Sequence, residues 1–172
     1  MTFRDANPDD VTALREMWCR FMTELHAGRH PSEEERDLWT SRLQTQVSRG
    51  QVVVAEEDRH LQGFAGFIEH SDRAFVPPSV AFLVDMYVAP AFRGQEVGMG
   101  LLRYVTKSVA GHGCKHVWTN TDESNQAAQR CLQKAGFKVL TGFALHGLTG
   151  QRYYRTDIQE QEAEHPRRTL RR

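Results

Sequence analysis

The feature that most constrains this sequence is a long apolar run that ends near a proline and is followed at once by a glycine-rich loop. Asp85 is the only charged residue in the run Val80–Val88, and the other residues are apolar. Such a run predicts a strand in the centre of a sheet, where both faces are covered. Pro90 ends the strand, because proline has no N–H to donate to a neighbouring strand. The loop 93–98 then leads into a predicted helix over Gly98–Ala110.

This order of strand, glycine-rich loop and helix is suited to binding an anion. The loop and the first helical turn carry N–H groups without intrahelical partners, and the helix dipole favours negative charge at the same place. Glycines let the backbone approach a ligand closely, and Arg93 adds a charged donor. No Gly-Lys-Ser/Thr follows, so the loop is not a Walker loop, and it does not follow the first strand of a dinucleotide-binding unit. The alternative is a strand–helix turn that binds nothing.

The remaining patterns predict one mixed α/β domain over residues 1–158 with the element order βααβββαβαββ. Strands are expected at Thr2–Arg4, Gln51–Glu56, Leu61–Ile68, Val80–Val88, His116–Thr119, Phe137–Leu148 and Gln151–Thr156. Helices are expected between Pro8 and Gly28, between Ser32 and Gly50, at Gly98–Ala110 and at Asn125–Ala135. Tyr153 and Tyr154 alternate on the last strand, so one should face the core and the other outward. Residues 159–172 have almost no apolar side chain and are expected to form a disordered tail.

Composition excludes several classes of function. Lys and Arg number 22 and Asp and Glu also number 22, and a net charge of zero argues against a protein that coats nucleic acid or acidic membrane. No apolar run approaches the roughly 20 residues of a membrane span, and the charged start Met1–Asp5 is unlike a secretory signal. The three cysteines form no pair of metal-binding spacing, and the histidines show no metal motif. We therefore expect a cytoplasmic protein without a metal.

Two spaced motifs in this sequence resemble those of the GNAT superfamily of N-acetyltransferases. The first family motif is a strand ending in Val-x-Pro-x-x-Arg-Gly, then a short glycine loop and a helix; here it is Val88-Ala89-Pro90-Ala91-Phe92-Arg93-Gly94-Gln95-Glu96-Val97-Gly98. The second is Asn-x-x-Ala, a residue seven positions after the asparagine, and Gly-Phe; here it is Asn125-Gln126-Ala127-Ala128, Leu132 and Gly136-Phe137. The resemblance covers about residues 2–157.

The resemblance implies acetyl-coenzyme A as co-substrate, with its pyrophosphate on the amides of the loop. It also implies that the central strand splays from its neighbour, so that the strand's backbone holds the pantetheine arm, while helices cover both faces of the sheet. The residues expected at the cofactor are Met86, Tyr87, Val88, Arg93, Gly94, Gln95, Glu96, Val97, Gly98, Met99, Gly100, Asn125 and Ala128.

The sequence departs from the family pattern at two positions. Glu96 stands where the family usually has glycine; a shifted register, Gln95-x-x-Gly98-x-Gly100, also fits the motif, but the first register keeps the distance from Pro90. Leu132 stands where the family often has a tyrosine that protonates the leaving thiolate, and leucine cannot donate a proton. Cys131 is the candidate replacement, with a buried structural cysteine as the alternative.

Acetyl transfer to an amine needs a base that removes a proton, and Asp85 is the first candidate because a carboxylate in an apolar strand is costly unless it is used or paired. A structural ion pair and the binding of a cationic substrate remain alternatives. Glu69 and His70 on the adjacent strand are second candidates, and Asp122 and Glu123 are expected to serve the dipole of the next helix. A backbone N–H near Val88 would hold the developing oxyanion.

These observations predict an N-acetyltransferase that acts on a small primary amine. A protein or peptide N-acetyltransferase and a non-catalytic acyl-coenzyme A-binding regulator are the alternatives. We expect a small-molecule amine as the partner, without nucleic acid or membrane, and a homodimer stays open.

Overall fold

The computed structural model describes residues 1–69, 78–140 and 150–158, and in them the elements follow the predicted order βααβββαβαββ. The strands are β1 (Thr2–Asp5), β2 (Val52–Glu57), β3 (His60–Glu69), β4 (Val80–Val88), β5 (His116–Asp122), β6 (Lys138–Val139) and β7 (Gln151–Asp157). The helices are α1 (Val11–Leu25), α2 (Glu33–Ser48), α3 (Val97–Gly111) and α4 (Gln126–Lys134), with short 3₁₀ helices η1 (Pro8–Asp10) and η2 (Pro90–Phe92).

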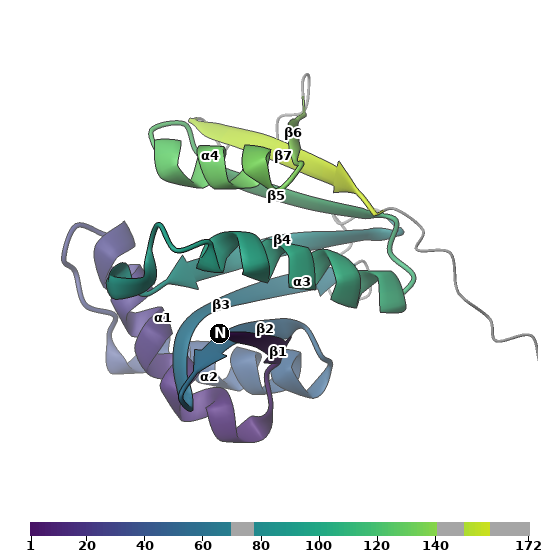
Figure 1. Cartoon of the computed structure of the whole chain (residues 1–172). Coiled ribbons are helices and arrows are strands. Elements are labelled where there is room, and N and C mark those ends of the chain that lie inside the picture. Colours follow the sequence, from purple (N-terminus) through teal and green to yellow (C-terminus); the bar gives the residue numbers. More distant parts are fainter. Residues whose placement is uncertain (70–77, 141–149, 159–172) are drawn as a thin grey trace, which may run out of the picture.

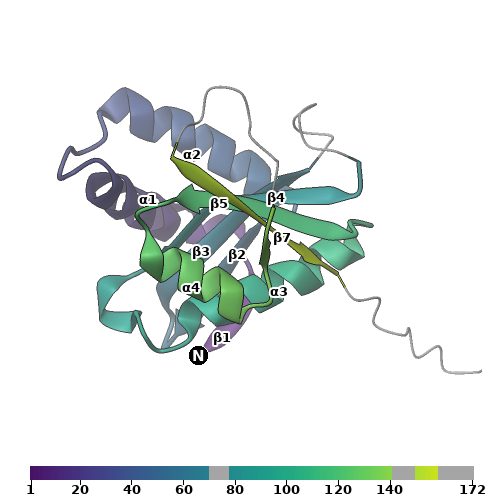
Figure 2. The same ribbon diagram turned by 90° about the horizontal axis from the view of Figure 1, so that it is seen from above.

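The strands form one mixed sheet in the order β1-β2-β3-β4-β5-β7-β6, and helices cover both of its faces. The pairing of β4 with β5 is parallel, and the other neighbours are antiparallel. Helices α1 and α2 lie on one side of the sheet and α3 and α4 on the other (Figure 2). Each side has its own apolar core, with Leu101 and Leu102 of α3 in one and Trp18 and Trp39 in the other. The predicted fold class is confirmed.

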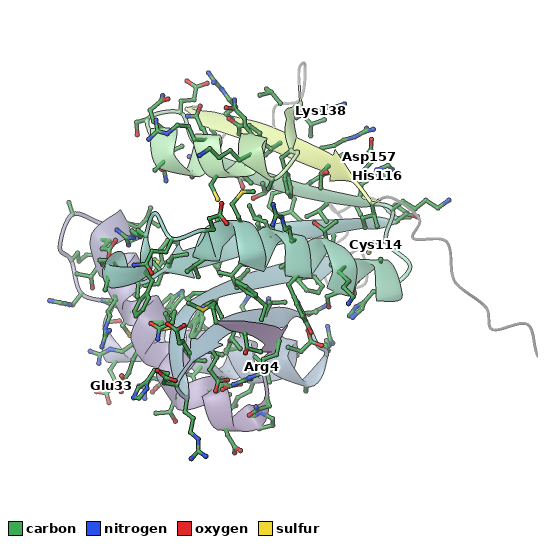
Figure 3. All side chains as sticks on the ribbon, viewed as in Figure 1. Arg4, Glu33, Cys114, His116, Lys138 and Asp157 are labelled. Atoms are coloured by element: carbon green, nitrogen blue, oxygen red, sulfur yellow. The ribbon has the colours of Figure 1, made fainter. Side chains whose placement is uncertain are left out.

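Local hydrogen bonds explain where the first helices begin. The side chain of Asn7 accepts from Asp9 N–H, and Ser32 forms a capping box with Glu35 at the start of α2. Arg4 of β1 (Figure 3) donates to both carboxylate oxygens of Asp10, at 2.7 and 2.9 Å, and to Glu56 of β2 at 2.7 Å. These bonds join β1, β2 and the turn before α1.

The splay of the central strand, which the resemblance implied, is confirmed. Strand β4 pairs with β5 only over Val80–Leu83, and the two strands then diverge (Figure 1). On its other edge β4 stays paired with β3, but Gly66 pairs with Asp85 while Phe67 pairs with Leu83. One residue of β4, Val84, is therefore left unpaired as a β-bulge.

The last part of the chain differs from the prediction. Tyr153 and Tyr154 face opposite sides of β7, as alternation requires, but both are buried, and the expectation that one faces outward is wrong. The reason is that both faces of β7 are covered, since Tyr153 packs with Val80 and Phe82 in a further apolar cluster. Of the predicted strand Phe137–Leu148 the structure describes residues 137–140, of which only β6 is a strand, and the predicted tail 159–172 lies outside the described residues. Within the described ranges, no helix has the length and apolarity to cross a membrane.

Candidate functional site

The loop between β4 and α3 presents a row of unused backbone donors. Gly94 has φ 79° and Glu96 has φ 63°, so the chain turns twice through the left-handed region before α3 begins at Val97. Within the described part of the chain, no hydrogen bond uses the backbone N–H groups of residues 94–99. The first helical bond runs from Gly100 N–H to Glu96 C=O at 2.9 Å. Unused amides at a helix N-terminus are the donors that an anionic group requires.

The backbone conformation supports the first of the two motif registers. Glu96 adopts a left-handed φ that favours glycine, as expected if it occupies a glycine position of the motif. Gly100 has a different reason to be glycine, because a Cβ there would lie 2.0 Å from the ring of Phe3. Since the amide of Gly100 is also used inside α3, this residue packs against β1 and does not contribute a free donor.

Beyond the bulge, one edge of β4 faces the side from which β5 has departed. Ala89 N–H donates to the C=O of Gln62 in β3 at 2.9 Å. The main-chain groups of Ala89 and Tyr87 are therefore directed toward β3. By alternation, the N–H and C=O groups of Met86 and Val88 are directed away from β3. Such an unpaired edge can accept an extended ligand as an added strand.

The N-terminus of α3 lies against α4 at this unpaired edge. A Cβ built on Gly98 would lie 3.1 Å from the Sγ of Cys131 and about 4 Å from the side chains of Val88 and Met86. Cys131 is half-buried, and burial raises the pKa of its thiol, against which Lys134 acts. The structure therefore brings together the loop, the strand edge and Cys131.

Asn125 and Leu132 have defined structural roles in α4. The Asn125 side chain caps the helix, because its Oδ1 accepts from Ala128 N–H at 3.0 Å. Leu132, which stands at the position of the family's tyrosine, is 3% exposed within the core under α3. Asn125 is an exposed residue at the start of α4, whereas Leu132 belongs to the interior.

Asp85 lies on the sheet face that α1 and α2 cover. Ala81 and Leu83 belong to the core under α3, and simple alternation would place Asp85 there too. The bulge at Val84 reverses the alternation, so Asp85 shares a face with Tyr87, which packs in the core under α1 and α2. The Asp85 carboxylate has no hydrogen bond or ion pair within the described residues. Burial raises its pKa, and the charge of Arg42 opposes this effect.

Arg93 contacts α1 and β4 in this structure. Its Nε donates to Val88 C=O at 2.9 Å, its terminal nitrogen donates to Glu24 at 2.6 Å, and its guanidinium lies 5.4 Å from the centre of the Tyr87 ring. The Tyr87 hydroxyl also donates to Glu24, at 2.7 Å. Burial and this carboxylate raise the pKa of Tyr87 to about 12. Arg93 thus fixes the end of β4 to the end of α1.

The second-ranked base, Glu69, lies away from this site. It pairs with Ala81 near the start of β4, and its carboxylate receives Cys114 Sγ at 3.4 Å and lies 3.1 Å from His112 Nδ1. Figure 3 shows Cys114 beyond the C-terminal end of α3, opposite to the loop. Burial, then the contact with Glu69, raises the pKa of Cys114 to about 12. His70 lies outside the described residues.

Two further expectations concern residues near α4 and metal binding. Asp122 accepts from the N–H and hydroxyl of Ser124, at 2.8 and 2.5 Å, just before α4. These bonds form a local turn ahead of the helix, whose cap is Asn125, and the dipole role expected for Asp122 and Glu123 stays a prediction. Across the described ranges, no group of His, Cys, Asp and Glu side chains could hold a metal ion.

A pocket near the end of α1 was not found from the sequence. It has a volume of about 430 Å³ and is lined by residues of α1, among them Arg20 and Glu24, by His30, and by Tyr87 and Pro90 at the end of β4. These residues come from two stretches of the chain, 19–30 and 87–90, and no local motif joins them.

Comparison with known proteins agrees with this geometry. The sequence model of the Acetyltransferase (GNAT) family matches residues 11–137. An uncharacterised N-acetyltransferase of Mycobacterium bovis is 30% identical over 91 residues, which are 53% of this chain and 54% of that protein. The chain thus spans about half the length of the curated relatives that it matches.

Solved structures share the fold over nearly the whole chain. The PaiA N-acetyltransferase of Thermoplasma acidophilum, in complex with coenzyme A, superposes with a TM-score of 0.69 at 20% identity, covering 91% of this chain and 98% of that one. An N-acetyltransferase of Staphylococcus aureus Mu50 gives 0.68 at 20% identity, covering 92% and 98%. With a family model that matches most of its length and a fold that agrees, the chain belongs to the GNAT acetyltransferase family.

Proposed function

We propose that this chain is an N-acetyltransferase that moves the acetyl group of acetyl-coenzyme A to the primary amine of a small molecule. The single observation that carries the proposal is the row of unused amides at residues 94–99 beside the unpaired edge of β4. The amides fit a pyrophosphate, and the edge of β4 fits the extended arm of the same ligand. The coenzyme A bound to the related fold of PaiA supports this assignment.

The residues divide the binding between them. The amides of Gly94, Gln95, Glu96, Val97, Gly98 and Met99 would hold the pyrophosphate. The main-chain groups of Met86 and the N–H of Val88 would hold the arm, since the C=O of Val88 already accepts from Arg93, and Gly98 leaves room between α3 and α4. Bound there, acetyl-coenzyme A supplies the acetyl group as an activated thioester.

Asp85 is the proposed general base for the attacking amine. Its carboxylate has no described partner, and burial raises its pKa above the ordinary value of 3.8, which makes it a better proton acceptor than an exposed aspartate. It faces the side of the sheet under α1 and α2, whereas Met86 and Val88 face the side under α3. An acceptor on the side under α1 and α2 could thus reach the unpaired edge of β4, where the main chain of Met86 would hold the cofactor arm.

Cys131 is the proposed proton donor for the leaving thiolate. Burial raises the pKa of its thiol, so the group keeps its proton at neutral pH, and it lies beside Gly98. Leu132 cannot fill this role, since it has no proton to donate and is buried. A packing role for Cys131 is the alternative, because it also contacts the core under α3.

The test of the mechanism is Asp85→Asn, with Asp37→Asn on the exposed side of α2 as a matched control. Loss of a general base should lower kcat at pH 7 by about 10²–10⁴-fold, and the variant's rate should recover as pH rises and more amine becomes neutral. Burial raises the pKa of the Asp85 carboxyl in the folded protein, so the ionised carboxylate destabilises the fold above that pKa. Asp85→Asn should therefore also raise Tm at pH 7. Unchanged kinetics in the folded variant would remove Asp85 from the mechanism.

A non-catalytic acyl-coenzyme A-binding regulator is the second candidate, favoured by the acidic Glu96 in the loop and by Leu132. Measuring thiol release with a panel of small amines and peptides separates the candidates. Cofactor binding without turnover on any acceptor would favour the regulator, and turnover of peptides alone would favour a protein N-acetyltransferase.

A further inference from the structure

The pocket at the end of α1 is lined by a residue of the strand that carries the proposed base. Tyr87 lines this pocket, and Asp85 lies two residues earlier on the same face of β4. Two residues of a strand span about 7 Å, so a molecule in the pocket can place an amine near Asp85 while the rest of it contacts α1. This step rests on the proposed function, since it takes the pocket as the acceptor's site.

The acidic residue of the pocket wall is already neutralised. One carboxylate oxygen of Glu24 accepts from Tyr87 and the other from Arg93. Burial alone would raise the pKa of Glu24, but these two donors outweigh it and lower the pKa, so the group is a paired anion. Glu24 therefore has little to offer a cationic ligand.

The pocket also holds a basic side chain without a partner. Arg20 has no hydrogen bond or ion pair to any residue in the described part of the chain, although its charge acts on Tyr87. Three residues further along α1, the hydroxyl of Thr23 donates to Cys19 C=O at 2.8 Å, so the contact of 3.1 Å with His30 is a hydrogen bond donated by Nδ1. The pocket thus combines an unpaired guanidinium, a histidine and the ring of Tyr87.

We propose that Arg20 is a specificity-determining residue and that the acceptor is an amine which also carries an anionic group, as an amino acid does. A guanidinium matches the two oxygens of a carboxylate or phosphonate in a bidentate contact. The anionic group binds at Arg20, the carbon chain lies along Tyr87, and the amine reaches Asp85.

The experiment measures the binding of matched probes to the coenzyme A-loaded protein by calorimetry. The probes are straight-chain ω-amino acids of three to six carbons, their neutral amides, and aminoalkyl phosphonates of the same lengths. The variants are Arg20→Gln, Arg20→Lys and, as a control on the same helix, Arg15→Gln, which removes an arginine paired with Asp37.

A charge-assisted contact should make wild type bind the anionic probe roughly 10- to 100-fold tighter than the neutral amide. Arg20→Gln should bring this ratio to roughly 1, Arg20→Lys should restore part of it, and Arg15→Gln should keep it. The preferred probe, carboxylate or phosphonate, identifies the anionic group. Equal affinity for anionic and neutral probes in wild type, or a ratio that survives Arg20→Gln, overturns the proposal.

Turnover of the same probes with acetyl-coenzyme A is measured in parallel. If neither these probes nor any amine of the panel is acetylated, the proposed function fails, while the binding ratio still decides whether Arg20 binds an anionic group. The two conclusions can therefore fail separately.

Discussion

Replacing Glu96 tests whether the loop binds the pyrophosphate, because this residue combines a left-handed backbone with a negative charge. The residue is exposed and has φ 63° and ψ 6°, a conformation that costs a non-glycine residue about 1 kcal/mol or more. Glu96→Gly relieves this strain, but glycine also gains conformational entropy in the unfolded chain, so the net gain in stability is about 0–1 kcal/mol. In a domain of this size that corresponds to a rise in Tm of up to about 4 °C.

The charge of Glu96 acts on ligand binding independently of its backbone. At a separation of about 8 Å, two unit charges repel by about 0.5 kcal/mol in water and about 2 kcal/mol at an effective dielectric constant of about 20. Because Glu96 is exposed, the lower part of this range applies. Removing the charge should therefore tighten the binding of coenzyme A by about two- to fivefold.

Two variants separate the two effects. Glu96→Gln removes only the charge, so it should tighten the binding of coenzyme A and leave Tm nearly unchanged, whereas Glu96→Gly should change both. The assay is calorimetry at low and high salt, with pantetheine, which lacks the pyrophosphate, as the control ligand. If Glu96→Gln binds coenzyme A with the wild-type Kd at low salt, or tightens pantetheine equally, the pyrophosphate does not lie on this loop.

Two further predictions concern ion pairs. Arg4→Met leaves the buried Asp10 without its cation and should lower the free energy of unfolding by about 2–3 kcal/mol at pH 7 in urea titrations. Because the hydrogen bond from Arg4 lowers the pKa of Asp10 below 3.8, this contribution is present above pH 4 and should be lost as pH falls through the lowered value. Arg93→Ala and Glu24→Gln break one half-exposed pair, so each should cost at most about 1 kcal/mol, and their double variant should be less than additive. A loss of coenzyme A affinity in Arg93→Ala alone, of about 1.5–3 kcal/mol, would instead place the guanidinium on the phosphate.

Much of the fold was predictable because the strands and helices begin and end at residues with strong local conformational preferences. The bounds of β4 agree with the sequence, since Pro90 stops the strand and Ser79, with φ 65°, precedes it. Helix α3 differs from the predicted range by one residue at each end. The burial of Tyr153 was not predictable in the same way, because alternation gives the face on which a residue lies but not whether other side chains cover that face.

The orientation of Asp85 shows what local patterns leave undecided. The apolar run predicts a strand but not its register, and a slip of one residue moves a side chain to the opposite face. The bulge at Val84 makes that slip within β4, opposite Gly66 and Phe67 of β3. Without it, Asp85 would point into the core under α3 and could not face a pocket at α1.

The wall of the pocket depends on contacts that the sequence does not reveal. Glu24 and Arg93 are 69 residues apart, and each by itself resembles an ordinary exposed charge. Only the fold places Glu24 between Arg93 and Tyr87, next to Arg20, which has no partner among the residues that the structure describes. The strand β4 and its loop carry features common to the family, whereas α1 carries the charges that would distinguish one acceptor from another. Substrate preference should therefore change with substitutions in α1 that leave the loop at residues 94–99 untouched.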